Sequence, residues 1–204
     1  MLWLGHQQDD IAETMLMRLA RGSGTSGLAA PRPVHSFPNG REHVRPLLAL
    51  KRAEIEEALR ACGVPWREDT TNRGEKYFRN KLRNRVLPAW KRASERDALA
   101  GAARSRELLD EDDSALEAWV DGLAPLTPGG ALKLERIAGV PRAVARRALH
   151  RWLLVQPAVG RLSRRGFDNL LSMVLTGSDS RQSIGAKGFA VLRGNWLRYV
   201  KATR

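Results

Sequence analysis

The sequence holds a single cysteine, Cys62, among its 204 residues. One cysteine excludes an internal disulfide and any zinc site built from several thiolates. Because Cys62 ends a predicted helix, we expect it to be a small buried side chain. The sequence also has no segment that resembles a signal peptide and no apolar run of membrane-spanning length. These absences predict a cytoplasmic protein that has no membrane partner.

Acidic residues are scarce as well. The chain has 22 Asp and Glu against 35 Lys and Arg, a formal net charge of +13 and a pI near 11.0. This surplus favours a polyanionic partner, nucleic acid before an anionic membrane, although a solvated basic surface is an alternative. Residues 31–110 and residues 111–204 each carry a net charge of +7, whereas residues 1–30 carry −1. A small acidic site in a basic chain suggests metal-assisted chemistry on an anionic substrate.

That acidic segment has the pattern of a short apolar strand, a turn, an amphipathic helix to about Arg21 and a glycine-rich loop. His6, Asp10 and Glu13 lie at i, i+4 and i+7, so they can face one side of the strand-to-helix junction. Carboxylates beside a phosphate are favourable when a cation such as Mg²⁺ lies between them. The same spacing also fits a helix that is only capped by Asp9 or Asp10, with His6 as a loop residue.

The rest of the chain is predicted to be mostly helical. Apolar periodicity indicates helices over residues 51–62, 76–90, 90–122, 140–155 and 164–175, with a loop over 22–43. Residues 44–48 are expected to be extended, the acidic run 111–113 to be solvated, and Gly194-Asn195 to form the turn of a hairpin. We expect domains over residues 1–92 and 123–204, joined by a helical linker over 93–122.

Two basic features are candidates for binding anions. Arg79 and Arg83 share a helix face at i, i+4, where like charges repel, so an anionic partner such as a phosphate backbone is favoured over a solvated face. The segment Arg21-Gly22-Ser23-Gly24 can hold a phosphate or a base with help from Arg18, or it can simply end the helix.

Taken in order, these residues resemble the tRNA(Ile)-lysidine synthetase family of the N-type ATP pyrophosphatase, or PP-loop, superfamily. The spacing His6-x-x-x-Asp10-x-x-Glu13-Thr14 looks like a superfamily motif that tRNA thiolases share. Four further motifs, in the same order as in the family, single out the lysidine synthetases within this superfamily. They are Arg18 with Arg21-Gly22-Ser23-Gly24 and Gly27-Leu28; Arg45-Pro46-Leu47-Leu48; Trp66-Arg67-Glu68-Asp69 with Asn72; and Arg79-Asn80 with Arg83. It covers residues 1–92 well and the C-terminal module more loosely.

The resemblance implies an α/β fold of the adenine nucleotide alpha hydrolase-like type. The chain as given is then mostly α-helical, with a small α+β C-terminal module that helps to select the tRNA. The implied reaction uses ATP and Mg²⁺ to join free lysine to the wobble cytidine of an isoleucine tRNA. ATP adenylates the C2 carbonyl oxygen with release of pyrophosphate, and the lysine amine then displaces AMP. The resemblance leaves open whether the protein forms a homodimer.

The resemblance also implies roles for individual residues. The expected catalytic residues are His6, Asp10 and Arg21. The nucleotide and metal side is assigned to His6, Asp10 and Glu13, with Asp10 as the Mg²⁺ ligand. The side facing cytidine or lysine is assigned to Arg18, Arg21, Gly22, Ser23, Gly24, Glu68, Asp69 and Asn72. Contact with tRNA is assigned to Arg45, Arg79, Asn80, Arg83 and Arg85.

The sequence departs from the family pattern in three places. Gln7 stands where a second His is frequent, and Ile11 where Gln is common. The pyrophosphate-binding loop, Ser-Gly-Gly-x-Asp-Ser, is found nowhere in the 204 residues. We therefore expect the chain to carry the second half of an ATP site and to be inactive by itself. The alternatives are an inert tRNA-binding fragment or another PP-loop tRNA-modifying enzyme, such as a thiolase, which the lone Cys62 disfavours.

Overall fold

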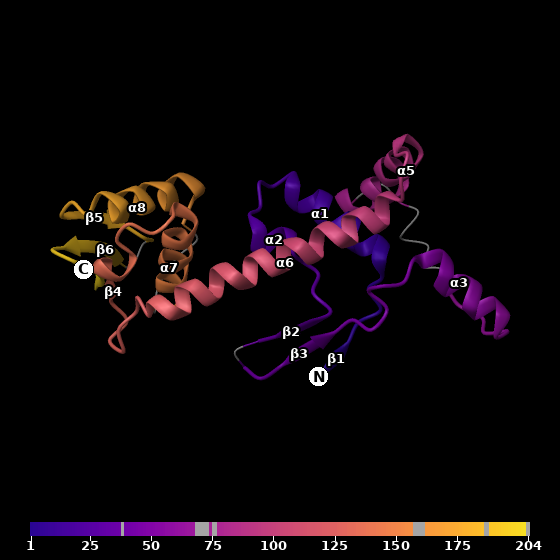
Figure 1. Ribbon diagram of the computed structural model, residues 1–204, viewed down its shortest axis with the longest axis horizontal. Helices are drawn as coiled ribbons and strands as arrows, with labels where there is room; N and C mark the ends of the chain where they lie inside the picture. The colour runs from indigo at the N-terminus through magenta and orange to yellow at the C-terminus, as the bar shows by residue number, and fades with distance from the viewer. Residues whose placement is uncertain (38, 68–73, 75–76, 157–161, 186–187, 203–204) are drawn as a thin grey trace. The chain divides into compact units, whose positions relative to one another are not determined.

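The computed structural model describes residues 1–37, 39–67, 74, 77–156, 162–185 and 188–202. The chain forms two compact units, Met1–Asp113 and Ser114–Arg204, and Figure 1 shows the elements of each. The division falls inside α6 (Ala98–Leu123), a helix that overlaps most of the predicted linker over 93–122. The predicted domain limits remain a prediction. None of the helices in the described ranges is both long and apolar enough to cross a membrane.

A small sheet forms one side of the first unit. Its strands are β1 (Leu2–Trp3), β2 (Val34–Ser36) and β3 (Glu42–Val44), in the order β1-β3-β2. The pairing of β1 with β3 is parallel, and that of β2 with β3 is antiparallel. The loop predicted over 22–43 is therefore wrong in part, since it contains two strands and α2 (Thr25–Leu28). Its Gly, Pro and Ser content hid strands of only three residues, which backbone pairing stabilises.

The first unit also contains α1 (Gln8–Leu19), α3 (Arg52–Ala61), α4 (Phe78–Lys81), a π-helical turn η2 (Leu82–Val86) and α5 (Leu87–Ala93). The cap of α1 differs from the prediction. Gln7, and neither Asp9 nor Asp10, is the N-cap: its side chain accepts a hydrogen bond from the Asp9 N–H, while Asp10 accepts one from the Gln7 N–H. This reciprocal capping box satisfies two N–H groups at the start of the helix.

Two burial predictions in this unit are wrong. All ten residues of α3 are described and none is buried, so Cys62, which follows this helix, is exposed. Asp113, expected to be solvated, is only 4% exposed. Its Oδ2 lies 2.6 Å from Arg32 Nη2, and Arg32 Nε lies 2.6 Å from Asp110 Oδ1. Arg32 comes from the segment after α2, a partner 81 residues away that no local pattern reveals.

The second unit packs two helices against a four-stranded sheet. Its strands are β4 (Leu132–Lys133), β5 (Ser180–Ser183), β6 (Gly188–Arg193) and β7 (Trp196–Lys201), in the antiparallel order β4-β7-β6-β5. The helices are α7 (Arg142–Leu154), α8 (Arg164–Thr176) and the 3₁₀ turn η3 (Leu134–Ile137). Arg193 pairs with Trp196 across Gly194-Asn195, which confirms the predicted hairpin and the α+β module.

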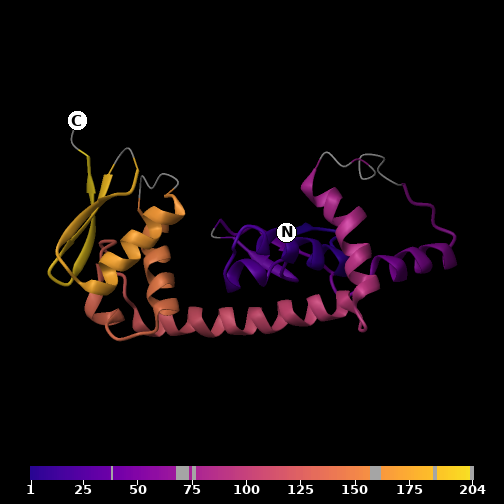
Figure 2. The same cartoon turned by 90° about the horizontal axis from the view of Figure 1, so that it is seen from above.

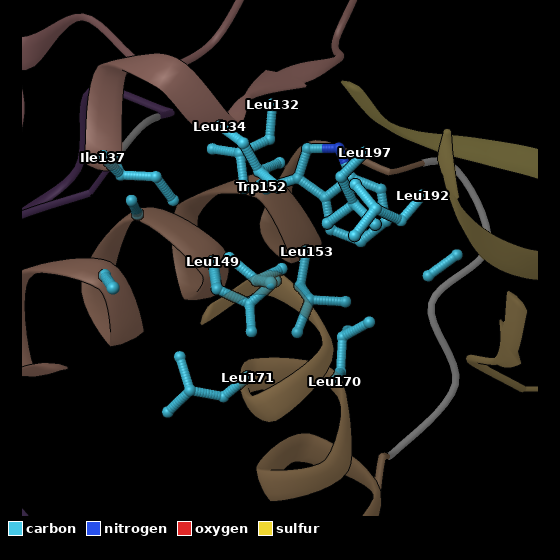
Figure 3. Packing of buried hydrophobic residues seen from close by; sticks show 14 of the residues in the cluster. Leu132, Leu134, Ile137, Leu149, Trp152, Leu153, Leu170, Leu171, Leu192 and Leu197 are labelled. Atoms are coloured by element: carbon cyan, nitrogen blue, oxygen red, sulfur yellow. The ribbon is translucent and has the colours of Figure 1, made fainter. Parts of the chain in front are cut away.

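The core of this unit surrounds Trp152, which is fully buried (Figure 3). Leucines of α7, α8 and the sheet pack around it, because buried positions alternate along β6 and β7. The core of the first unit is smaller. Its central cluster consists of Ala12, Leu87, Leu99 and Ala102, with Met15, Leu16 and Trp90 packed against it.

Candidate functional site

Two predicted site residues meet at one edge of the β1-β3-β2 sheet. Because β1 and β3 are parallel, their carboxyl ends lie at the same edge, and the chain continues to His6 after β1 and to Arg45 after β3. Arg45 Nε donates a hydrogen bond to His6 Nδ1 at 3.2 Å, and Arg45 Nη1 donates one to the Arg32 carbonyl at 2.7 Å. An accepting Nδ1 leaves the imidazole hydrogen on Nε2, so His6 can present one N–H donor.

The surroundings of His6 keep its ring neutral. Burial lowers the pKa of His6, and the cations of Arg45 and Arg79 lower it further. The carboxylates of Asp10 and Glu13 act in the opposite direction but do not reverse the shift. A neutral His6 is therefore the form present at pH 7.

This environment predicts a titration for His6. Its pKa is expected below the ordinary 6.5, so its contribution to stability is complete above pH 6.5 and is lost as pH falls from there toward the folded-state pKa. NMR titration of the His6 ring protons, assigned with a His6→Gln variant, measures the midpoint. In Arg45→Gln the midpoint should rise, because a nearby cation is removed. A midpoint at or above 6.5 in the unmodified chain would contradict the lowered pKa of His6.

The acidic side chains of α1 lie against α4 and η2. Asp10 and Glu13 are one helical turn apart and buried, with Glu13 at 0% exposure. Buried carboxylates require charged partners or several hydrogen-bond donors. The first turn of α1 also holds Ile11 and Ala12 in the protein interior, which fixes the face that the two carboxylates occupy.

Their partners are Arg79 and Arg83. Arg79 donates from Nε to Glu13 Oε2 at 2.6 Å and from Nη2 to Asp10 Oδ1 at 2.5 Å. Arg83 donates from Nε to Glu13 Oε1 at 2.6 Å and from Nη2 to Glu13 Oε2 at 3.0 Å. The hydrogen bond with Glu13 raises the pKa of Arg83. We call these four residues the charge cluster: Asp10, Glu13, Arg79 and Arg83.

The two arginines of the basic helix pair with carboxylates of their own chain. The sequence predicted an anionic partner for Arg79 and Arg83, and in the structure carboxylates of the same chain take that place. Asn80, which lies between them, is buried and donates to the Gly74 carbonyl at 2.7 Å. Arg85 is exposed. A direct tRNA contact for these residues remains a prediction.

The arrangement does not fit a magnesium ion bound to Asp10. Asp10 Oδ1 already accepts from Arg79, its Oδ2 accepts from the Gln7 N–H, and both oxygens of Glu13 accept from guanidinium groups. Over the part of the chain that the structure describes, no group of three or more His, Cys, Asp or Glu side chains could hold a metal ion. Asp10 and Glu13 are thus engaged by guanidinium groups and do not form a magnesium site in this arrangement.

A hollow of about 330 Å³ opens beside the charge cluster. Its walls come from α1, α3, η2 and α5, and they are lined by Gln7, Asp9, Glu13, Arg52, Arg83, Leu87, Pro88, Lys91 and Arg92. Four of these side chains are cationic and two are carboxylates, one of which is already paired with Arg83. The walls of the hollow therefore favour an anionic ligand.

The glycine-rich segment forms a closed loop between α1 and α2. The N–H of Ser23 donates to the Arg18 carbonyl at 3.0 Å, and Gly22 has a left-handed φ of 71°, as expected for a residue that ends a helix. A Cβ on Gly27 would lie 2.8 Å from Ser23 Cβ and 3.3 Å from Arg18 Nη1, so only glycine fits there. Arg18 is partly buried in this loop, whereas Arg21 is exposed, as are Gly22 and Gly24.

The structure thus brings three sets of predicted residues together: His6 with Arg45, the charge cluster, and Arg18 with the loop from Gly22 to Gly27. Glu68, Asp69 and Asn72 lie outside the described residues. Sequence reasoning missed the contact of Arg45 with His6. The extended segment predicted over 44–48 is wrong beyond Val44, which ends β3, because residues 46–49 form a turn. The parallel pairing of two- and three-residue strands, which brings Arg45 to His6, was not predictable.

Comparison with known proteins gives a consistent assignment. A family model described as a PP-loop domain matches residues 1–90. A tRNA(Ile)-lysidine synthase of Solibacter usitatus is 37% identical over 203 residues, which cover 96% of this chain and 45% of that protein. Proteins of the same name from Geobacter sulfurreducens and Streptomyces coelicolor are 37% and 31% identical, over 82% and 97% of this chain and 36% and 56% of their own lengths.

The chain therefore spans about half the length of the curated relatives that it matches. The aligned region nevertheless extends beyond the PP-loop match into the second unit. The shared sequence thus includes both the site residues of the first unit and the C-terminal module. The chain belongs to the tRNA(Ile)-lysidine synthase family, whose PP-loop domain has an adenine nucleotide alpha hydrolase-like fold.

Proposed function

We propose that this chain is part of an ATP-dependent ligase that forms lysidine in an isoleucine tRNA. The observation that carries the proposal is the alignment with tRNA(Ile)-lysidine synthases over nearly the whole chain. In the proposed reaction, the C2 oxygen of cytidine attacks ATP and becomes bonded to AMP, and pyrophosphate leaves. The lysine amine then attacks C2, the C2–O bond breaks, AMP departs with that oxygen, and the amine loses a proton.

The residues at the sheet edge support a role beside the nucleotide. His6 is neutral and has its hydrogen on Nε2, so it can donate to a phosphate oxygen without adding charge to the site. Arg45 holds the ring in that tautomer through Nδ1. An aligned N–H donor stabilises charge that develops on an oxygen as the phosphate is transferred.

The charge cluster and the hollow support a role in ordering the anionic substrates. Arg79 and Arg83 are fixed by Glu13, so their guanidinium groups keep a defined orientation. Arg52, Lys91 and Arg92 add positive charge around the hollow, which suits a phosphate group of ATP or tRNA. We assign the loop from Arg18 to Gly24, together with Glu68, Asp69 and Asn72, to cytidine or lysine. The protein is proposed to act in the cytoplasm.

A chimeric protein tests the proposed function. Residues 1–204 would replace the aligned region of the Solibacter usitatus relative, which is similar over 203 residues. The chimera should incorporate labelled lysine into isoleucine tRNA when ATP is present, and His6→Ala should slow this incorporation about 100-fold, because alanine removes one N–H donor to a developing charge.

The 204-residue chain alone serves as the negative control for the chimera. It is expected to form no lysidine, because its sequence contains no Ser-Gly-Gly-x-Asp-Ser loop to bind pyrophosphate. Turnover by the isolated chain would contradict this expectation. A folded chimera that binds tRNA without incorporating lysine would instead favour the alternative of an inert tRNA-binding protein.

A further inference from the structure

The C-terminal sheet has an outer face that no described element of its own unit covers. Side chains alternate along strands, so residues of one parity share a face. Leu192 and Leu197 point into the core, while their neighbours point the other way. We call this second surface the open sheet face, formed by Arg181, Ser183, Phe189, Val191, Arg193, Trp196, Arg198 and Val200. Figure 2 shows α7 and α8 on one side of the sheet, and no described element of this unit lies on the opposite side.

The composition of the open sheet face is unusual for a solvated surface. The register places Arg181, Val191 and Arg198 in one row across three strands. Phe189 and Trp196 lie in the rows on either side, and both are only partly buried. The solvated side of an antiparallel sheet ordinarily carries polar residues. Here two aromatic rings and three arginines share a face formed by three strands.

The cations and rings on this face are already arranged in stacked pairs. The Arg181 guanidinium carbon lies 3.6 Å from the centroid of the Phe189 ring. Two cations lie near Trp196, with Lys133 Nζ at 5.5 Å and the Arg198 guanidinium carbon at 5.6 Å from the centroid of its ring. Unstacked RNA bases stack on aromatic rings and on planar guanidinium groups, while the positive charges contact phosphates.

The shape and charge of the face suit a polyanion. A hollow of about 950 Å³ runs over it, and its lining includes Arg181, Arg193, Arg198 and Lys201 against one carboxylate, that of Asp179. Asp179 accepts a hydrogen bond from the Gly194 N–H at 2.8 Å, so part of its charge is used within the hairpin. The lining therefore has a net charge of +3 beside the partly buried Trp196 and the exposed Val200.

We infer that the open sheet face binds RNA through unpaired bases that stack on Trp196 and on the Arg181–Phe189 pair. Phosphates of the same strand contact Arg193 and Arg198. This inference rests on the proposed function in one respect, since that function makes tRNA the RNA at hand. It adds a defined surface and a mode of recognition. Stacking makes the contact tolerant of base identity and specific for unpaired nucleotides.

The test uses the full 204-residue chain and two fluorescent probes, an isoleucine tRNA transcript and a ten-nucleotide polyuridine. Fluorescence anisotropy at several salt concentrations gives the affinity and its salt dependence. Arg181→Gln with Arg198→Gln should weaken binding of both probes at least tenfold and lower the slope of log affinity against log salt by about 1 to 2, because two phosphate or stacking contacts are lost. Trp196→Leu should weaken the binding about tenfold by removing a stacking platform.

Matched control variants distinguish the effect of the open sheet face on RNA binding from the effect of net charge. Arg164→Gln with Arg165→Gln removes the same charge from exposed positions at the start of α8, and Trp119→Leu removes an exposed Trp from α6. These controls should change affinity less than twofold, and circular dichroism should give the same folded spectrum for every variant. Equal weakening by controls and face variants would overturn the inference, as would a chain that binds neither probe.

Two further outcomes separate this inference from the proposed function. If the face variants change sedimentation of the chain but not RNA binding, the face is an interface between copies and the RNA assignment is overturned. If they weaken RNA binding while the chimera makes no lysidine, the open sheet face stands and only the proposed reaction fails. If the chimera makes lysidine and the variants bind tRNA normally, only this inference fails.

Discussion

Replacing Glu13 with glutamine is expected to lower the free energy of unfolding of residues 1–113 by about 3 kcal/mol. Glu13 is 0% exposed and accepts hydrogen bonds from both Arg79 and Arg83. Removing its charge leaves two guanidinium groups with one carboxylate, that of Asp10, between them. The loss falls at the lower end of the range for broken buried pairs, because both arginine side chains are partly exposed and regain water.

Hydrogen exchange measured by mass spectrometry resolves this effect within the two-unit chain. In Glu13→Gln, amides of α1 and α5 should exchange at least 100-fold faster, which corresponds to about 3 kcal/mol. Peptides of α7 and α8 provide an internal reference in the second unit. Glu57→Gln is the matched control, since Glu57 is exposed on α3. Similar exchange in the two variants would show that the charge cluster does not stabilise the unit.

Replacing Trp152 with alanine is expected to destabilise residues 114–204 by about 4 kcal/mol. Trp152 is 0% exposed and lies among leucines of α7, α8 and the sheet, as Figure 3 shows. Alanine would lose most of that packing and leave a cavity. Since domains are stable by only about 5–15 kcal/mol, the second unit should become partly unfolded at 37 °C.

A second variant distinguishes packing from hydrogen bonding at this position. Among the described residues, Trp152 Nε1 has no hydrogen-bond acceptor although it is buried. Trp152→Phe should therefore cost less than about 1.5 kcal/mol, because the unpaired N–H is removed together with some of the ring. Trp119→Ala, at a side chain that is 48% exposed, is the control and should have little effect. Hydrogen exchange of α8 peptides measures all three, and equal losses for Phe and Ala would contradict the packing explanation.

Local patterns predicted much of the architecture. The helices over 51–62, 140–155 and 164–175, the hairpin at Gly194-Asn195 and the strand-to-helix junction at His6 are present in the structure. Each depends on a few neighbouring residues whose periodicity or turn chemistry is visible in the sequence. The resemblance to the lysidine synthetase family, which rested on ordered motifs, is confirmed by the relatives.

Features that depend on distant partners were not predictable. The burial of Asp113 requires Arg32, which is 81 residues away. The identity of the anion beside Arg79 requires knowing that α1 and α4 pack together, over a separation of 66 residues. Cys62 is exposed because α3 buries none of its residues, although its apolar spacing is typical of a helix with an inner face. Sequence periodicity shows which face could be buried, but tertiary packing decides whether it is.

The π-helical turn η2 constrains how this part of the chain can vary in length. The N–H of Leu87 bonds to the Leu82 carbonyl, five residues back, so η2 contains one more residue than an α-helical turn would. Deleting one residue there would tighten the wide turn into an α-helical one and leave the side chains on either side of it facing as they do now. Arg79 would stay beside Glu13, and Leu87, now 4% exposed, would stay in the core. A single-residue deletion is therefore easier to tolerate in η2 than in the middle of α1, where it would rotate everything beyond it by about 100°.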